Sequence, residues 1–299
     1  MATATQDMQA RTFDVQVDLE AAADVLVPRR ALETDTGELS AHVDTHGVTA
    51  SVPLPLRGVR SVRDLGGYPL VDKEGHAGFT TTGAFLRGGS LFFLTGSDVE
   101  MLRTYGVTRV IDLRSPFELR LFKDAFCRGR YPDIDYVSVP MMDQINSRGI
   151  SGQVPDRMSD VYCGILDDDA ASVRQVFMAL DDDGCVLFHC RCGKDRTGVI
   201  AMLLLKLVGT SDDAVIADYA VSDRYSGRTM GLQRVGLRII ARRPVTALFV
   251  SAPDEMERTL DHLYREYGSA REYLEQVAEV PAAVLDSIVT RLAGQSAVA

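Results

Sequence analysis

Residues 185–198 read CVLFHCRCGKDRTG, and this stretch decides the fold of the chain. Its first part, Cys185 to His189, is a short apolar run typical of a buried strand. Residues 199–208 read VIAMLLLKLV, which is an apolar run typical of a buried helix, and Gly209 is placed to end that helix. The stretch therefore predicts a strand, a polar loop and a helix in direct succession.

The predicted loop separates Cys190 from Arg196 by five residues. Backbone N–H groups of such a loop can point into one concavity, where the helix dipole adds positive potential, so the loop can hold a phosphate dianion. The planar guanidinium of Arg196 can bind two phosphate oxygens at once. The same field favours the thiolate of Cys190, which makes it a nucleophile, and Thr197 can donate a hydrogen bond to that thiolate and ease its later departure. We expect the phosphate to be bound by Arg191, Cys192, Gly193, Lys194, Asp195, Arg196 and Thr197, with no metal and no cofactor.

The loop resembles the H-C-x-x-G-K-D-R-T-G loop of the cysteine-dependent protein tyrosine phosphatases, in the form found in bacterial tyrosine and phosphoinositide phosphatases. The loop is also similar to that of the mycobacterial protein tyrosine phosphatase B type. Five further segments resemble segments of that family and extend the resemblance from about Pro53 to Ala293: residues 61–68 (SVRDLGGY), 85–91 (FLRGGSL), 110–115 (VIDLRS), 217–223 (ADYAVSD) and 267–269 (YGS). The resemblance implies a phosphomonoester hydrolase that forms a cysteinyl-phosphate intermediate.

Two aspartates compete for the role of general acid. The resemblance implicates Asp195, whose carboxyl could be kept protonated beside a bound phosphate by repulsion between like charges. Its alternative role is an ion pair that orients Arg196. Asp143 follows a predicted strand over residues 134–140 and stands where other tyrosine phosphatases carry a general-acid loop, although it could equally be a solvated carboxylate. The sequence leaves both open.

Other charged residues have supporting roles in this interpretation. Lys194 adds a second cation at the rim of the loop, which the resemblance associates with phosphoinositide substrates, unless it is a solvated surface charge. His189 ends the predicted strand, and we expect it to order the loop rather than to transfer protons. The resemblance places Arg63 and Asp64 near the site, with buried ion pairs in the N-terminal segment as the alternative. Arg87 and Arg114 are further contributors to substrate recognition.

The chain has five cysteines in 299 residues, which do not form a disulfide framework, and their odd number points to a reducing compartment. The first residues lack the basic and apolar regions of a signal peptide, and no apolar run reaches the length of a membrane span, so we expect a cytoplasmic protein, with signal-less export left open. Cys192 or Cys185 could trap oxidised Cys190 as a disulfide, or each could simply be a small packed side chain.

The composition of the chain limits the classes of molecule that it is expected to bind. The formal net charge of −10 and a pI near 5.0 argue against nucleic-acid binding and against broad attraction to anionic membranes. Hydrophobic residues make up 46% of the chain, which is enough for a substantial core. Phosphate must therefore be recruited by a local site.

Strands and helices alternate around the loop, which predicts an α/β fold with a central, mostly parallel sheet flanked by helices. Beyond residues 185–208, we expect a strand over 107–113, a helix over 170–180, and two or three helices from Asp254 onward, around Pro281. We also expect Ser97 and Gly106 to cap a helix between them. The acidic runs 167–169 and 181–183 are interpreted as a helix N-terminus and a turn, not as metal ligands. The loop would lie at the carboxyl end of a strand, where α/β sheets bind ligands.

The first part of the chain has a different pattern. Residues 13–19 alternate strictly, and residues 43–56 are rich in β-branched side chains, so we predict a β-rich N-terminal extension over 1–55 and a catalytic domain over 56–299. The extension could add a layer, mediate dimerisation or cover the site. Between Asp143 and Tyr162 the chain has fewer residues than the helical lid of the resembling mycobacterial type, and Gly149, Gly152 and Pro155 indicate a loop, so we expect a more open site.

Three functions follow from these patterns. The leading hypothesis is a protein tyrosine phosphatase with dual or phosphoinositide specificity, and its alternative is a phosphatase acting on a nucleotide or sugar phosphate in a biosynthetic pathway. The third is a non-catalytic phosphate-binding module, which would not require the thiol. The expected partner is thus a phosphorylated protein, a phosphoinositide or a small phosphomonoester, and the sequence does not indicate an oligomeric state.

Overall fold

The computed structural model describes residues 51–73, 75–141, 157–222, 224–225 and 251–293. The predicted alternating strand over 13–19, Asp143 and the predicted loop with Gly149, Gly152 and Pro155 lie outside the described residues. The domain boundary after residue 55, the role of the extension and the openness of the site therefore stay predictions.

A five-stranded sheet forms the centre of the described region, with the strands in the order β1-β4-β7-β5-β6. β1 runs antiparallel to β4, and all other neighbours are parallel. The strands are β1 (Arg63–Asp64), β4 (Phe85–Gly88), β5 (Val107–Asp112), β6 (Asp135–Ser138) and β7 (Cys185–His189), and a separate hairpin pairs β2 (Pro69–Val71) with β3 (Ala77–Phe79). This arrangement confirms the predicted α/β class with a mostly parallel sheet.

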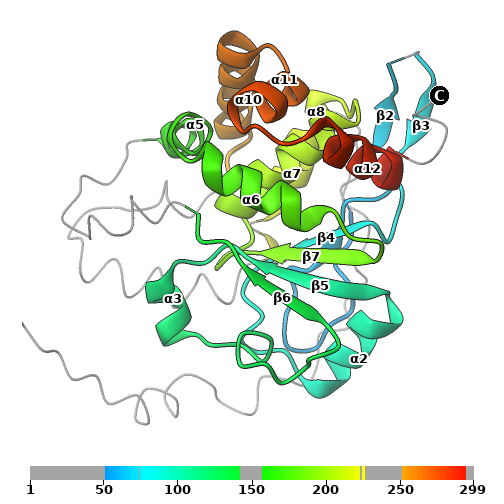
Figure 1. Ribbon diagram of the computed structural model, residues 1–299, viewed down its shortest axis with the longest axis vertical. Coiled ribbons are helices and arrows are strands. Elements are labelled where there is room, and N and C mark those ends of the chain that lie inside the picture. Colours follow the sequence, from blue (N-terminus) through cyan, green and yellow to red (C-terminus); the bar gives the residue numbers. More distant parts are fainter. Residues whose placement is uncertain (1–50, 74, 142–156, 223, 226–250, 294–299) are drawn as a thin grey trace, which may run out of the picture. The chain divides into compact units, whose positions relative to one another are not determined.

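Helices cover both faces of the sheet (Figure 1). On one face lie α5 (Met158–Asp168), α6 (Ala170–Leu180), α7 (Asp195–Leu207), α8 (Asp212–Ala220), α10 (Pro253–Tyr267), α11 (Ala270–Glu272) and α12 (Ala282–Ala293), with a short π turn, η3 (Tyr273–Val277), before α12. On the other face lies α2 (Gly96–Thr104), while α3 (Pro116–Leu121) follows the carboxyl end of β5. Side chains of β7 point alternately into two hydrophobic clusters, Val186 and Phe188 into one and Cys185 and Leu187 into the other. Burial on both faces explains the unbroken apolar run of this strand.

Helix α7 is the predicted apolar helix, and it begins at Asp195, four residues before its apolar run. It contacts β4 together with α5, α8 and α11, so its side chains from Arg196 to Leu205 are all buried. A helix that is apolar all round needs such complete cover. The predicted end is confirmed, since the helix stops at Leu207 and Gly209 adopts a φ of 82°.

Two local predictions need correction. The N-cap of α2 is Thr95, which forms a capping box with Asp98, so Ser97 lies inside the helix instead of capping it. The acidic run 167–169 does not begin a helix as a unit, because Asp167 and Asp168 end α5 and only Asp169 stands at the start of α6. The predicted helix over 170–180 matches α6, and the C-terminal helices around Pro281 are also confirmed.

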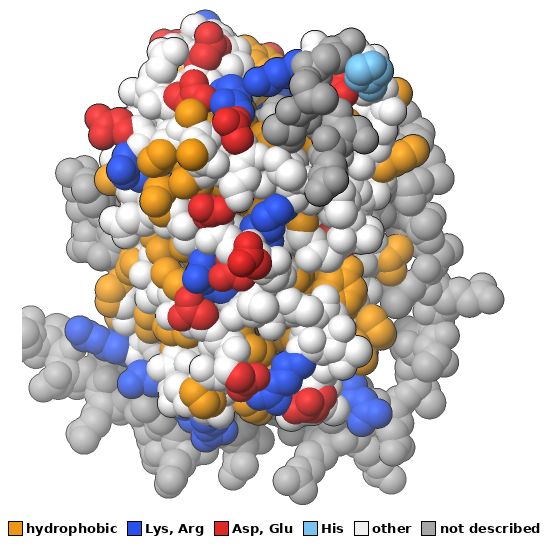
Figure 2. Space-filling view, turned by 45° about the vertical axis from the view of Figure 1, so that its right-hand side comes forward, with side chains coloured by type: hydrophobic (Ala, Val, Ile, Leu, Met, Phe, Trp, Pro, Cys, Tyr) orange, Lys and Arg blue, Asp and Glu red, His pale blue; other side chains and the backbone are white. Residues whose placement is uncertain are grey.

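Within the described ranges, none of the helices has the length and apolar character needed to cross a membrane. On the face displayed in Figure 2, acidic and basic side chains are interspersed. The predicted cellular compartment stays a prediction.

Candidate active site

The predicted loop, residues 190–194, joins β7 to α7 at the carboxyl edge of the sheet. β7 is the middle strand, so the loop opens where α/β sheets hold ligands. The N-cap position of α7 is Lys194. An ammonium group cannot accept a hydrogen bond, so it cannot satisfy the N–H groups of the first helical turn. Those donors and the positive end of the helix dipole are therefore available to an anion.

Cys190 lies at the bottom of this loop and is 1% exposed. The backbone N–H of Gly193 donates a hydrogen bond to its Sγ atom, with a distance of 3.2 Å between nitrogen and sulfur. The hydrogen bond expected from Thr197 is not formed: its Oγ1 atom is buried and bonds to none of the residues that the structure describes. The donor that faces the sulfur is thus a backbone group of the loop itself.

Gly193 is held against the β4 strand and the residues after it. Its φ is 70°, and a Cβ atom at this position would come within 2.5 Å of the backbone nitrogen of Gly89. Arg87 of β4 donates from Nη2 to the Gly193 carbonyl at 2.9 Å, and the N–H of Ser90 donates to the Arg191 carbonyl at 2.9 Å. The loop conformation therefore depends on a glycine and on donors from another segment.

Arg87 and Arg63 share a buried counter-ion, Asp218 of α8. Arg63 donates from Nε to Oδ1 of Asp218 at 3.0 Å, and Arg87 binds the other carboxylate oxygen. The Tyr68 hydroxyl also donates to Oδ1, at 2.9 Å. Burial alone would raise the pKa of Asp218, but the two guanidinium charges outweigh it and lower the pKa. Of the two alternatives for Arg63, the structure places it in the buried ion pair.

Arg196 is oriented by Glu118, a residue that the sequence interpretation missed. Its Nη1 and Nη2 atoms donate to the two carboxylate oxygens of Glu118 at 2.7 and 2.8 Å, and Nη1 also donates to the Leu113 carbonyl at 3.1 Å. Glu118 is placed by a capping box at the start of α3, where its carboxylate accepts from the N–H of Ser115 at 2.8 Å. The pattern Ser-Pro-x-Glu over residues 115–118 is the signal that could have identified this helix start.

Electrostatics keep the Arg196–Glu118 pair charged. Burial would raise the pKa of Glu118, but its hydrogen bonds with Arg196 and the charge of that residue lower it below its usual value. The same contacts hold the pKa of Arg196 above its usual value, against the opposing effect of burial. The ion pair that orients Arg196 is therefore made by Glu118, not by Asp195.

Asp195 instead contacts the side chains of Tyr162 and Lys194. The Tyr162 hydroxyl of α5 donates a short hydrogen bond to its Oδ1 atom, and Lys194 Nζ lies 3.3 Å from the same oxygen. The expected position of Lys194 at the rim of the loop is wrong, because its side chain is buried. A buried ammonium group needs a counter-charge, and Asp195 provides one.

His189 and two carboxylates form a buried cluster behind the loop. His189 Nδ1 lies 3.2 Å from the Cys190 carbonyl oxygen, which matches the expected ordering role, and its Nε2 lies 3.6 Å from Oδ2 of Asp112. Atoms of Asp112, Asp124 and His189 lie within 4.8 Å of one another, as metal ligands would. Arg114, however, donates to both carboxylates, at 2.6 and 2.5 Å, so a guanidinium already supplies the positive charge there.

The remaining predicted residues are Asp64 and the two thiols of Cys192 and Cys185. The carboxylate of Asp64 accepts hydrogen bonds from the N–H groups of Gly66 and Gly83, at 2.6 and 2.7 Å, and so folds the N-terminal segment. Burial raises the pKa of the Cys192 thiol to about 12, and the charges of Cys190 and Asp195 add to this effect. Burial likewise raises the pKa of Cys185 to about 12. Both groups are neutral thiols near neutral pH, and their redox role stays a prediction.

An aromatic shelf, which we define as Phe92, Phe93 and Phe122, lies beside the loop. The guanidinium of Arg191 lies 5.0 Å from the centre of the Phe122 ring, and Phe92 meets Phe122 edge to face at 5.7 Å. Phe92 and Phe93 are 37% and 54% exposed. The shelf presents apolar surface to solvent next to a residue of the phosphate-binding loop.

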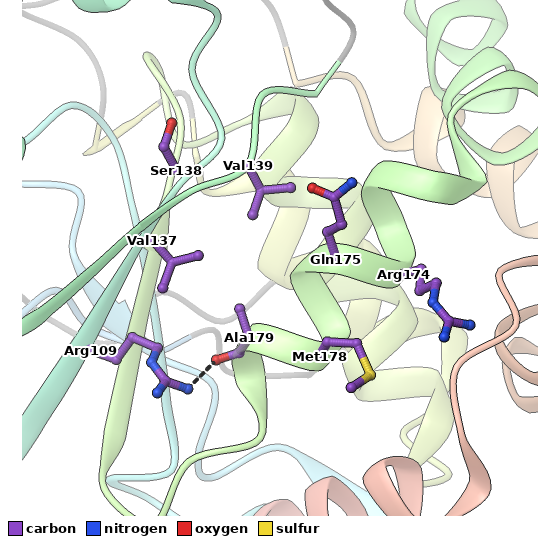
Figure 3. Close-up of a pocket in the computed structure, with 8 residues that line it drawn as sticks. All are labelled: Arg109, Val137, Ser138, Val139, Arg174, Gln175, Met178 and Ala179. Atoms are coloured by element: carbon purple, nitrogen blue, oxygen red, sulfur yellow. Dashed lines mark hydrogen bonds between the residues drawn. The ribbon is translucent and has the colours of Figure 1, made fainter.

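A separate shallow cavity of about 450 Å³ lies between β6 and α6 (Figure 3). Val137 and Val139 form one side of it, and Gln175 and Met178 form the other. Arg109 at its edge donates to the Ala179 carbonyl at 2.9 Å. The residues lining this cavity do not include the loop residues, so it is not the predicted phosphate site.

The region that contains this site also matches a family of known proteins. The sequence model described as "Tyrosine phosphatase family" matches residues 54–294. The chain belongs to the tyrosine phosphatase family. The match begins and ends close to the range of the sequence resemblance, and the predicted enzyme class, a phosphatase of the tyrosine phosphatase type, is confirmed at the level of the family.

Three members of this family illustrate the similarity. A tyrosine-protein phosphatase of Nostoc commune is 35% identical over 144 residues, which are 48% of this chain and about half, 49%, of that protein. A Cupriavidus necator protein provisionally named a tyrosine-protein phosphatase is 29% identical over 83% of this chain and 94% of its own length. The triple specificity protein phosphatase PtpB of Mycobacterium tuberculosis is 28% identical over 54% of this chain and 70% of its own. Among solved structures, TpbA of P. aeruginosa covers 53% of this chain and 86% of its own at 17% identity, with a TM-score of 0.28.

Proposed function

We propose that the chain hydrolyses phosphomonoesters through a cysteinyl-phosphate intermediate on Cys190. The observation that carries the proposal is a backbone donor on the Cys190 sulfur beside a helix N-terminus, together with a pre-oriented Arg196 guanidinium that interacts electrostatically with that thiol. These groups stabilise negative charge on sulfur and on phosphate oxygens alike. A binding module would need the donors but not the thiol.

In the first step the Cys190 thiolate attacks phosphorus, the sulfur–phosphorus bond forms and the bond to the leaving oxygen breaks. Asp195 gives its proton to that oxygen, and Arg196 holds two of the remaining phosphate oxygens. In the second step water attacks phosphorus, Asp195 takes a proton from the water, and the thiolate leaves. Atoms and protons balance over the cycle, because Asp195 ends in the form in which it began.

The hydroxyl of Thr197 can donate a hydrogen bond, which is what the thiolate needs when it leaves phosphorus in the second step. A buried hydroxyl without a partner costs about 1–3 kcal/mol, so the Thr197 hydroxyl gains a hydrogen bond if negative charge develops within its reach during the reaction. We infer that Thr197 donates to the sulfur when it leaves phosphorus. The same hydroxyl would be without use in a module that only binds phosphate.

The aromatic shelf supports an aromatic leaving group. A phenol ring can pack edge to face on Phe92 or Phe93 while its phosphate lies in the loop, whereas a sugar offers these rings no aromatic partner. We therefore favour phosphotyrosine in a protein, with dual or phosphoinositide specificity as the wider range. We further propose that residues 56–299 form the catalytic domain, because the anchors of the loop named above, among the described residues, lie within them.

The test is phosphate release by the full chain from phosphotyrosine, phosphoserine, phosphoinositide, nucleotide and sugar phosphates. Cys190→Ser is the inactive variant, and Cys163→Ser, at a half-buried thiol of α5, is the matched control. We expect turnover to be strongest on phosphotyrosine and to disappear only in Cys190→Ser. A sharp preference for one metabolite would replace the substrate assignment. Phosphate binding without turnover on any substrate would contradict the enzyme.

A further inference from the structure

The carboxylate of Asp195 is anchored at one oxygen by a chain of two tyrosine hydroxyls. Tyr162 donates to Oδ1 of Asp195, so its own oxygen must accept the proton of Tyr219, whose hydroxyl oxygen lies 2.8 Å away. The two rings meet edge to face at 5.9 Å, and both side chains are buried. Helices α5 and α8 thus reach the first residue of α7 through Tyr162 and Tyr219.

The tyrosine hydroxyl remains a donor throughout the working pH range. Burial raises the pKa of Tyr162 well above its usual value, and the negative charge of Asp195 adds to this effect. A hydroxyl that keeps its proton donates to a carboxylate more strongly than to a carboxylic acid, because the acceptor is charged. Tyr162 therefore favours the ionised form of its partner and also restricts its rotamer.

We propose that Tyr162 is a positioning residue that holds Oδ1 of Asp195 and thereby directs Oδ2 toward the leaving group. This inference rests on the proposed function, and it assigns the general acid to Asp195 in preference to Asp143. In the acid form the proton is on Oδ2, since Oδ1 is occupied as an acceptor.

Other charged groups face Asp195 and act on the same proton. Lys194 lies 3.3 Å from Oδ1 and also favours the ionised carboxylate, while Arg196 directs its charge to Glu118. The thiols of Cys190 and Cys192 lie on the loop side, and a bound phosphate dianion there would favour the protonated acid. Tyr162 carries no formal charge, so its replacement by phenylalanine changes none.

The experiment compares Tyr162→Phe with Tyr219→Phe, a matched loss of one hydroxyl from the same pair of rings. The profile of kcat against pH on an aryl phosphate is measured for both, for wild type, and for Asp195→Asn and Asp143→Asn. In the Tyr162→Phe variant we expect the basic limb of the kcat profile to move to higher pH by about 1 unit, because the carboxylate loses a hydrogen bond. In Tyr219→Phe we expect a smaller shift of the same limb. The limb should vanish in Asp195→Asn and persist in Asp143→Asn. Thermal unfolding of each variant checks that the fold is retained.

A second measurement does not depend on turnover. In protein labelled with 13C at the aspartate carboxyl carbons, the Asp195 signal is the one missing from Asp195→Asn, and its titration should occur at higher pH in Tyr162→Phe than in wild type. An unshifted titration would overturn the role of Tyr162, even if Cys190-dependent hydrolysis is found. An unshifted limb, or a limb that survives in Asp195→Asn, would also overturn it. Hydrolysis through a cysteinyl phosphate on Cys190 would then stand, with a group other than Asp195 as the acid in the second case. If the wild-type protein itself hydrolyses no substrate, the proposed function is refuted. The carboxyl titration would still decide the role of Tyr162.

Discussion

Glu118 and Arg196 are joined by two parallel hydrogen bonds, from Nη1 to Oε2 at 2.7 Å and from Nη2 to Oε1 at 2.8 Å. The fork of the guanidinium is thus oriented before any phosphate arrives. The carboxylate that orients it belongs to α3, which is 78 residues away along the chain. An arginine held in this way loses little side-chain entropy when it binds an anion.

Glu118→Gln should weaken phosphate binding, because the amide offers Arg196 one acceptor oxygen in place of two and no charge. We expect the inhibition constant for inorganic phosphate to rise about 10-fold, which corresponds to one charge-assisted hydrogen bond. Competitive inhibition of aryl phosphate hydrolysis measures this constant. Glu100→Gln, which neutralises one of the two carboxylates that bind Arg103 on the exposed side of α2, is the control and should leave the constant unchanged. Equal constants for Glu118→Gln and wild type would show that Arg196 does not need this carboxylate.

Asp218→Asn should destabilise the fold strongly. It leaves the buried guanidinium groups of Arg63 and Arg87 without a counter-charge, and breaking a buried pair in this way costs about 3–5 kcal/mol. Urea unfolding at neutral pH gives the loss of free energy. Asp133→Asn provides the comparison, because Asp133 also accepts two hydrogen bonds from one arginine but at an exposed site, and we expect a much smaller loss there. Similar losses for the two variants would contradict the burial argument.

The stabilisation by Asp218 should depend on pH in a defined direction. Its pKa is lowered in the folded state, since Arg63 and Arg87 outweigh the effect of burial, whereas the unfolded chain has a value of about 3.9. The contribution is therefore complete above the unfolded value and is lost as the pH falls through the lower folded value. The difference in unfolding free energy between wild type and Asp218→Asn should stay constant from pH 8 to 5 and shrink below about pH 4. A difference that grows on acidification would reverse the assigned sign.

Gly193→Ala should abolish the shape of the loop. Its added Cβ atom would lie 2.5 Å from the nitrogen of Gly89, in addition to the strain of a φ of 70°. We expect kcat/KM to fall by about 100-fold or more, because displacement of the reacting groups by 1 Å has an effect of that size. Gly67→Ala is a matched control with a φ of 85° and no atom within 4 Å of the added carbon. If both variants lose the same activity, backbone strain and not the contact with Gly89 is responsible.

The centre of the fold could be predicted because its signals are local. The apolar runs before and after the loop define β7 and α7, and the burial of both faces of the sheet explains why the strand lacks alternation. The N-cap of α2 was predicted at Ser97 because two hydroxyl residues stand close together, and only the Thr-x-x-Asp spacing from Thr95 to Asp98 distinguishes them.

The partners of the loop residues could not be predicted in the same way. Glu118, Tyr162 and Arg87 reach the loop through tertiary contacts that no periodicity in the sequence records. Helix α5 was missed because the glycines and proline before it indicated only a loop. The burial of Lys194 depends on the same packing, since a lysine after a glycine reads as exposed in the sequence alone.

The hydrogen bond from Arg87 to the Gly193 carbonyl has a practical consequence for protein engineering. The ten residues from His189 to Gly198 are not a transplantable cassette. Grafted onto the strand–helix junction of an unrelated scaffold, they would lack the β4 arginine that holds the carbonyl, the Ser90 amide that holds Arg191 and the α3 carboxylate that holds Arg196. A designer who wants this chemistry elsewhere must carry over three separate supports along with the loop.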